Sequence, residues 1–329
     1  MNFTFIICTR NSQRLISEVL ESIVVQNIDK NKIEVIISDY KSTDATLSVA
    51  KKFLSNSGVK FVEINCQNAG KSPAMTLALD AATGDYSVIV DDDNVLFPNY
   101  IEQALTLLTS PNVGCLGAQG VLDENLQTPY WFSEYKGHYA IGVIPQARDW
   151  VWGACAIINM SAWRKLRKNG FEIQLNPARI SQSHPIALGG EDTELSLAIY
   201  MLGYEVRFAE QLRFIHKFEQ ARLSEKYLLE NTYGCCRSVP VTEMYRAVAY
   251  RINYPFPKLI WTLVLFRMIA GCTIRAFKNY LISDKLKAKY NYVIATGIFS
   301  GYLQYRKSFT EIYTKLVEIR DAQLLNLNQ

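Results

Sequence analysis

The segment GDYSVIVDDDNVLFP, residues 84–98, governs how the rest of the sequence is interpreted. Its apolar run from Tyr86 to Val90 predicts a buried strand, and Asp91, Asp92 and Asp93 follow at the end of that strand. Crowded carboxylates repel one another and lose hydration unless a cation neutralises them. Mg²⁺ and Mn²⁺ favour such oxygen ligands and commonly complete their shells with substrate phosphates. A solvated acidic turn is the alternative interpretation of this run taken alone.

Upstream of this segment, short β-branched runs alternate with stretches of helical periodicity. We predict strands at 3–8, 33–37 and 59–64, and helices at 15–24, 45–54 and 72–82. Parallel neighbours need crossover helices, so this order predicts an α/β fold with a mostly parallel sheet flanked by helices. Such sheets bind ligands beyond the carboxyl ends of their strands, where polar residues at 9–11, 39 and 91–94 fall.

Beyond residue 110 the alternation is less regular. The pattern there predicts a strand at 154–158, helices at 162–168 and 192–202, and a mobile polar loop at 176–184. From about residue 223 it becomes wholly helical. We therefore predict a catalytic domain over 1–222, made of halves 1–110 and 111–222, and a helical C-terminal region over 223–329.

Composition narrows the class of protein. The net charge of +4 is too small to imply a nucleic-acid partner, and neither GxGxxG nor GxxxxGK[ST] occurs. Seven cysteines without a CxxC pair indicate buried thiols in a reducing compartment. The N-terminus lacks the features of a secretory signal, and no charge-free apolar run approaches the roughly 20 residues that span a bilayer. These features predict a cytoplasmic protein.

Several motifs, in order, carry a resemblance to a known family. Residues 84–98 resemble the DxD segment of family 2 glycosyltransferases, which have the GT-A fold. IICTRNS (6–12), EVIISDYKSTDAT (34–46) and NAGKSPAMTLAL (68–79) resemble the preceding motifs of the same family. The resemblance covers roughly residues 1–220 and implies the nucleotide-diphospho-sugar transferase fold, with residues 1–110 binding a nucleotide sugar and 111–222 the acceptor.

The resemblance also implies roles for individual residues. Those expected at the donor are Thr9, Arg10, Asn11, Asp39, Lys71, Asp91 and Asp92. Those expected at a Mn²⁺ or Mg²⁺ ion are Asp91, Asp93 and His216. From the residues alone, Lys71 equally suits a solvated lysine at a helix start, and a lone histidine such as His216 is more often structural.

A second acidic motif, GGEDTELSLAIYMLGYEV (189–206), predicts a glycine loop that enters a helix. Acids in a first helical turn usually complement the helix dipole. The resemblance instead implies that Asp192 is the catalytic base, with Glu191 its neighbour in the acceptor site. A base that takes the proton of an acceptor hydroxyl, opposite the leaving group, implies a single displacement with inversion.

The segment WVWGACAIINMSAWRKL (150–166) resembles the border of the family's acceptor pocket. Trp150 and Trp152 could stack on a sugar face, although aromatic residues near a strand are more often core. Gly153 is consistent with close approach of the backbone to a substrate.

The C-terminal region is basic and apolar. Between residues 246 and 289, Asp284 is the single acid, against nine basic residues: Arg246, Arg251, Lys258, Arg267, Arg275, Lys278, Lys285, Lys287 and Lys289. Such helices suit an anionic membrane surface. They equally suit a cap on the catalytic domain or an oligomer contact, and both alternatives stay open at this stage.

Taken together, the sequence predicts a metal-dependent, inverting hexosyltransferase that uses a nucleotide sugar, with UDP favoured. The expected acceptor is a hydroxyl of a glycan or lipid-linked saccharide in cell-surface polysaccharide or glycoconjugate synthesis. The expected location is the cytoplasm, with a peripheral position at the inner face of the cell membrane as one alternative. A sugar nucleotidyltransferase is the alternative, but it usually needs a glycine-rich loop that IICTRNSQR (6–14) lacks. A non-catalytic nucleotide-sugar-binding module would have lost one acidic motif, and both motifs are present.

Overall fold

The structure, a computed structural model, describes all residues except 69, 145–148, 176–188, 253–254 and 328–329. The predicted loop at 176–184 therefore lies outside the described residues. The strands are β1 (Phe3–Thr9), β2 (Ile33–Asp39), β3 (Lys60–Asn65), β4 (Tyr86–Asp91), β5 (Asn94–Leu96), β6 (Val113–Leu122), β7 (Ala156–Asn159) and β8 (Glu205–His216). The helices are α1 (Ile16–Val24), α2 (Thr46–Ser55), α3 (Lys71–Ala81), α4 (Tyr100–Leu107), α5 (Phe132–Tyr135), α6 (Met160–Lys168), α7 (Glu191–Met201), α8 (Glu225–Ala249), α9 (Pro257–Leu281), α10 (Lys285–Tyr305) and α11 (Phe309–Leu327).

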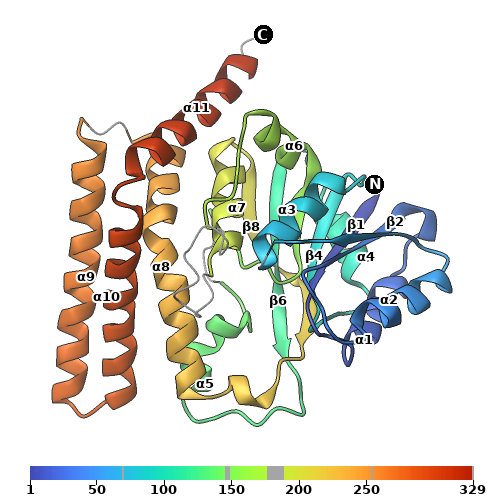
Figure 1. Cartoon of the computed structure of the whole chain (residues 1–329), viewed down its shortest axis with the longest axis horizontal. Helices are drawn as coiled ribbons and strands as arrows, with labels where there is room; N and C mark the ends of the chain where they lie inside the picture. Colours follow the sequence, from blue (N-terminus) through green and yellow to red (C-terminus); the bar gives the residue numbers. More distant parts are fainter. Residues whose placement is uncertain (69, 145–148, 176–188, 253–254, 328–329) are drawn as a thin grey trace.

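One sheet with strand order β3-β2-β1-β4-β7-β6-β8-β5 forms the centre of the molecule. The first four strands are parallel, as the sequence predicts. In the second half β7 pairs antiparallel with β4 and β6, and β5 pairs antiparallel with β8, so the sheet is mixed. The predicted α/β fold with a mostly parallel sheet and C-terminal helices is confirmed (Figure 1).

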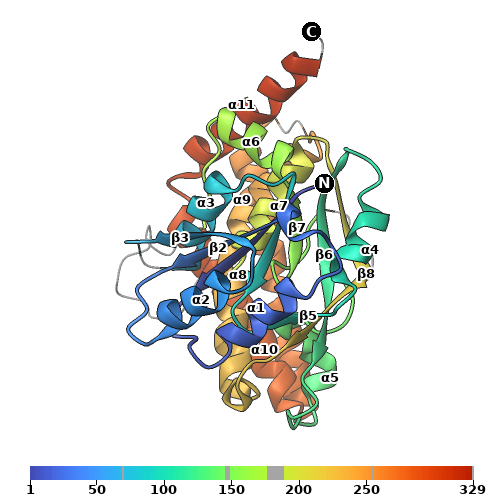
Figure 2. The same ribbon diagram turned by 90° about the vertical axis from the view of Figure 1, so that its right-hand side faces the viewer.

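Two hydrophobic layers cover the sheet. On one face α1, α2 and α4 bury residues such as Leu20, Leu54 and Ile101 against the strands. On the other face α3, α6 and α7 bury residues that include Met75 and Trp163. Figure 2 shows α1 and α2 lying together on one side of the strands.

The C-terminal helices form further layers outside α7. Side chains of α8, α9, α10 and α11 belong to the same buried cluster as α3, α6 and α7. In Figure 1 the order outward from the sheet is α7, α8, α10 and α9. Close contact between α8 and α10 depends on two glycines of α10, because a Cβ at Gly301 would lie 2.3 Å from the Arg237 carbonyl oxygen and one at Gly297 2.7 Å from the Cys236 Cβ. All seven cysteines are free thiols, five of them buried.

Candidate active site

The carboxyl ends of three parallel strands meet at one edge of the sheet. In the register of these strands Thr9 lies opposite Asp39, and Cys8 lies opposite Asp91. Polar residues at the ends of β1, β2 and β4 are therefore neighbours, although they are up to 83 residues apart in the chain. This edge gathers most of the residues expected at the donor.

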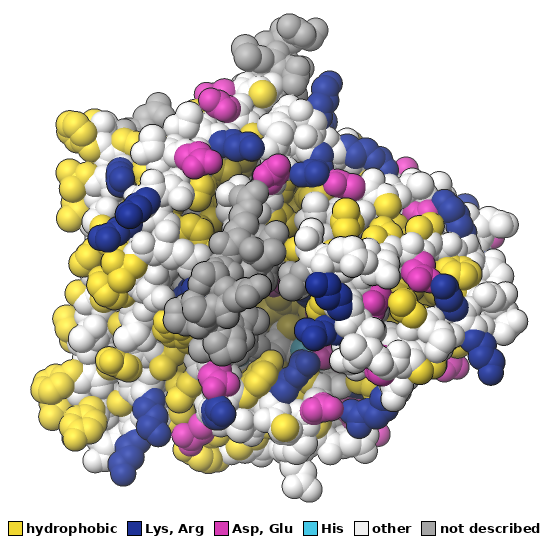
Figure 3. Space-filling view, in the orientation of Figure 1, with side chains coloured by type: hydrophobic (Ala, Val, Ile, Leu, Met, Phe, Trp, Pro, Cys, Tyr) yellow, Lys and Arg dark blue, Asp and Glu magenta, His cyan; other side chains and the backbone are white. Residues whose placement is uncertain are grey.

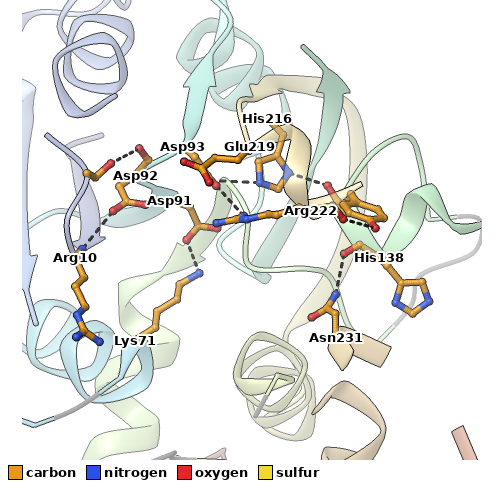
Figure 4. A network of polar contacts seen from close by, with 12 residues as sticks. Arg10, Lys71, Asp91, Asp92, Asp93, His138, His216, Glu219, Arg222 and Asn231 are labelled. Carbon is orange, nitrogen blue, oxygen red and sulfur yellow. Dashed lines mark hydrogen bonds and ion pairs between the residues drawn. The ribbon is translucent and has the colours of Figure 1, made fainter. Parts of the chain in front are cut away.

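Asp92 joins the ends of β4 and β1. Its carboxylate accepts hydrogen bonds from the Thr9 hydroxyl at 2.7 Å and the Arg10 backbone N–H at 3.3 Å. Burial raises the pKa of Asp92 to about 6, although the Thr9 hydrogen bond opposes the rise. The Arg10 side chain is exposed beside this contact (Figure 4).

Asp91 pairs with Lys71, the first residue of α3 (Figure 4). Burial lowers the pKa of the Lys71 ammonium, but the charges of Asp91 and Glu191 outweigh that effect and raise it well above its ordinary value. Lys71 is therefore a permanent cation between the aspartate cluster and the second acidic motif. The solvated-lysine alternative does not describe it, because its side chain is only 30% exposed.

Asp93 contacts one side chain at the end of β8 and another from the turn that follows β8. Arg222 donates to its carboxylate at 3.1 Å, and the His216 Nε2 lies 3.4 Å from its other oxygen (Figure 4). His216 reaches this position because β8 pairs antiparallel with β5, which starts one residue after Asp93 and places His216 opposite Asn94. Burial raises the pKa of Asp93, but His216 and then Arg222 outweigh it and lower the pKa to about 2.

The donor set around Asp93 fits a divalent cation. The His216 Nδ1 lies 2.7 Å from the Tyr139 carbonyl oxygen, which can only accept, so this nitrogen carries a proton. The His216 Nε2 and an Asp93 carboxylate oxygen, 3.4 Å apart, are both atoms of the kind that ligate a divalent cation. Among the described residues no group of three or more His, Cys, Asp or Glu side chains could hold a metal alone.

Asp39 offers an unused acceptor. Its side chain is 2% exposed, and one carboxylate oxygen accepts from the Ser42 N–H at 3.0 Å. The other oxygen is buried with no hydrogen-bond partner among the described residues, so a ligand N–H could satisfy it. Asn11 is engaged differently: its side chain accepts from the Thr43 N–H at 2.8 Å and holds the two loops together.

Glu191 and Asp192 begin α7, and Glu191 lies close enough to Lys71 for its charge to raise the pKa of that lysine. Asp192 accepts from the Gly153 N–H at 2.8 Å, and a side chain at Gly153 would contact Asp192 at 3.0 Å. Gly153 thus permits the approach of α7 itself. Burial, and then the charge of Asp192, raise the pKa of Glu191 to about 7, although Lys71 opposes the rise.

The expectation for Trp152 is wrong. Its side chain is 8% exposed, its indole N–H donates to the Ala118 carbonyl at 2.6 Å, and its ring packs edge-on against Phe208. Because both the ring and its N–H are used in the core, Trp152 has no face to offer a sugar. Trp150 is half-buried, and its contact with an acceptor stays a prediction.

Two features of the site were not predicted from the sequence. Arg222, from the turn before α8, contacts Asp93 and lies over the Tyr227 ring, with the guanidinium 5.9 Å from the ring centroid. Helix α8 also packs directly on the glycines before Glu191: a Cβ at Gly190 would lie 2.4 Å from the Ser238 hydroxyl, and Gly190 has a φ of +103°. The available sequence signal for Arg222 was a basic residue six positions after His216.

The chain is similar to known glycosyltransferases in sequence. A family model described as "Glycosyl transferase family 2" matches residues 4–167, and one described as "Glycosyl transferase family group 2" matches residues 87–283. It is 29% identical over 108 residues to the poly(ribitol-phosphate) beta-N-acetylglucosaminyltransferase TarS of Staphylococcus aureus, covering 33% of this chain and 19% of that protein. It is 24% identical over 237 residues to the glycosyltransferase GlyA of Streptococcus pneumoniae, covering 67% of this chain and 31% of that protein. The chain thus aligns with about a fifth to a third of the length of these relatives.

Solved structures share the fold. The mannosyltransferase PcManGT from Pyrobaculum calidifontis, in complex with GDP-Man and Mn²⁺, has a TM-score of 0.57 and 19% identity over 99% of this chain and 87% of that one. S. aureus TarS residues 1–349 in complex with UDP-GlcNAc have a TM-score of 0.51 and 16% identity over 92% of each chain. The fold is therefore of the GT-A type. With one family model matching more than half of its residues, this chain belongs to the family 2 glycosyltransferases.

Proposed function

We propose that this protein transfers a hexosyl group from a nucleoside-diphosphate sugar, with UDP favoured, to an acceptor hydroxyl with inversion. The observation that carries the proposal is the position of Lys71, which pairs with Asp91 and lies close enough to Glu191 for the charges of Asp91 and then Glu191 to raise its pKa. A donor diphosphate at the aspartate cluster and an acceptor at the start of α7 would then both lie next to Lys71.

On the donor side, three groups suit the parts of a nucleotide sugar. The unpaired buried oxygen of Asp39 matches the imide N–H of a uracil ring. Thr9 and Arg10 contact Asp92 at the same edge of the sheet, and Lys71 and Arg222, which pair with Asp91 and Asp93, would supply positive charge to a diphosphate. The UDP-GlcNAc and GDP-Man bound by the structural relatives are donors of this class.

Asp93 and His216 would hold Mn²⁺ or Mg²⁺, with Asp91 nearby. When bound, such an ion stabilises the charge on a departing nucleoside diphosphate. Arg222 contributes in the same direction, because a guanidinium close to the diphosphate favours the charged leaving group.

On the acceptor side, Asp192 is the proposed base. It accepts the hydroxyl proton while the new bond from that oxygen to the anomeric carbon forms and the bond from this carbon to the diphosphate oxygen breaks. The hydrogen bond from Gly153 fixes the carboxylate orientation. Glu191 and the half-buried Trp150 border the acceptor, which we propose is a glycan or lipid-linked saccharide used in cell-surface polymer synthesis.

A donor screen tests the donor and metal proposal. Purified protein is mixed with nucleotide sugars with and without Mn²⁺, and melting temperature and nucleotide release are measured. We expect metal-dependent stabilisation by one donor, and its loss in both Asp91→Ala and Asp93→Ala. Asp29→Ala, an exposed aspartate before β2, is the matched control. Stabilisation that survives both site substitutions would sink the proposal.

The base assignment has a separate test. Asp192→Asn keeps the side-chain shape and one oxygen that can still accept from Gly153, losing only the hydrogen bond from Thr193, so donor-induced stabilisation should persist. Transfer or donor hydrolysis should fall by roughly 10²–10⁴-fold, the usual contribution of a positioned base. Unchanged turnover would exclude Asp192 from that role.

A further inference from the structure

Helix α9 has two apolar faces, and only one of them is covered. Trp261, Leu265, Cys272 and Ala276 are buried toward the rest of the protein. On the opposite face the apolar residues recur every three, four or eight positions and are 44–67% exposed. This outer stripe consists of Leu259, Leu263, Phe266, Ile274, Phe277 and Leu281. The most apolar 18-residue window of α9 has a mean hydropathy of 1.6, yet only 22% of it is buried.

The exposed apolar surface is concentrated here. Of the twenty large apolar side chains exposed among the described residues, twelve lie between residues 256 and 303. The outer stripe continues onto α10 because the Phe266 ring contacts Phe299 and Tyr302 at centroid distances of 6.4 and 5.3 Å. Figure 3 shows hydrophobic side chains along the left edge of the molecule, where α9 lies, with lysine and arginine among them. An exposed apolar patch of this extent marks a surface that binds a partner or a membrane.

The charge beside the stripe identifies the occupant. Residues 257–281 contain four basic side chains and no acid. Arg267 and Lys278 each follow a stripe phenylalanine and are eleven positions apart, so they lie on the same flank of the helix. Neither has an ion-pair partner in the part of the chain that the structure describes. A second copy of this face would bring like charges together, whereas a surface with anionic headgroups above an apolar layer complements both features.

We propose that the outer stripe of α9, flanked by Arg267 and Lys278, docks the protein on an anionic lipid bilayer with the helix in the plane of the interface. A spanning orientation conflicts with the packing. The opposite face of α9 packs on α10, which in turn packs on α8 and the catalytic core. Arg267 would also lie close to the middle of a spanning helix, where a charge is costly. Docking does not depend on the donor or on the base proposed above.

The test uses full-length protein and vesicles of phosphatidylcholine alone or with about 30% phosphatidylglycerol. We expect cosedimentation with the anionic vesicles, weaker binding to neutral ones, and release by added salt, which screens exposed charges. Arg267→Gln with Lys278→Gln should weaken binding by roughly tenfold or more, because each cation near the surface contributes a several-fold factor. Ile274→Ser with Phe277→Ser should weaken it by roughly a hundredfold, since both side chains enter the apolar layer.

Controls separate the outcomes. Lys32→Gln with Lys52→Gln removes two exposed charges distant in sequence from α9 and should leave binding unchanged. Equal melting temperatures would show that the variants fold, and unchanged nucleotide release would separate docking from catalysis. Wild-type protein that stays in the supernatant would overturn the inference. A dimer that dissociates when Ile274 and Phe277 are replaced, with vesicle binding unchanged, would also overturn it. So would wild-type protein that resists alkaline extraction from membranes, because such a protein spans them.

Discussion

Replacing Glu191 with glutamine should change how stability depends on pH. Burial and the neighbouring Asp192 raise the pKa of this carboxyl from 4.5 to about 7 in the folded protein. An acid with a raised folded pKa destabilises the fold when ionised, so its contribution is most favourable below pH 4.5 and is lost as pH rises toward 7. Each pKa unit corresponds to about 1.4 kcal/mol, which makes the full difference about 3 kcal/mol.

Glutamine cannot ionise, so the variant should escape this loss. Relative to wild type, its free energy of unfolding should rise by up to about 3 kcal/mol between about pH 4.5 and pH 8. For a chain of this size, that corresponds to roughly 3–6 °C in melting temperature. The assay is thermal unfolding across this pH range, in EDTA so that bound metal does not contribute.

The matched control is Glu102→Gln. Glu102 also lies in the first turn of a helix but is exposed, so its pH dependence should be nearly that of wild type. A Glu191→Gln difference that stays constant across the pH range would refute the argument. It would show that Glu191 ionises in the fold as readily as in the unfolded chain.

Three other substitutions test separate parts of the structure. Gly301→Val should destabilise the protein by about 1–3 kcal/mol in urea unfolding, because its Cβ would meet the Arg237 carbonyl; wild-type stability would contradict the α8–α10 packing. Tyr245→Phe removes a 2.6 Å hydrogen bond to the buried Glu194 carboxylate and should cost about 1–3 kcal/mol in the same assay; no loss would show that other donors suffice. Asp39→Asn keeps one oxygen for the Ser42 N–H and replaces the unpaired oxygen with a hydrogen-bond donor, so nucleotide-sugar binding in calorimetry should weaken by about tenfold; unchanged affinity would remove the unpaired oxygen from the nucleotide pocket.

Much of the donor half could be predicted from local patterns. Alternating strands and helices over the first 90 residues imply a parallel sheet, and strand ends in a parallel sheet converge. That reasoning brings Thr9, Asp39 and Asp91 to one edge, where the structure places them. The second half was harder, because β5 has three residues and β7 four, too short to show a clear period.

The sequence by itself determined the fold class, because that depends on the periodicity of short stretches, and its ordered motifs carried the resemblance that indicated the family and the two acidic motifs. Tertiary structure alone decided what these motifs contact. His216 and Arg222 reach Asp93 only through the pairing of β5 with β8, and Trp152 is removed from the acceptor side by packing against Phe208. It also decided which apolar face of α9 remains exposed. Pairing and burial depend on the whole chain packing together, and no local pattern encodes them.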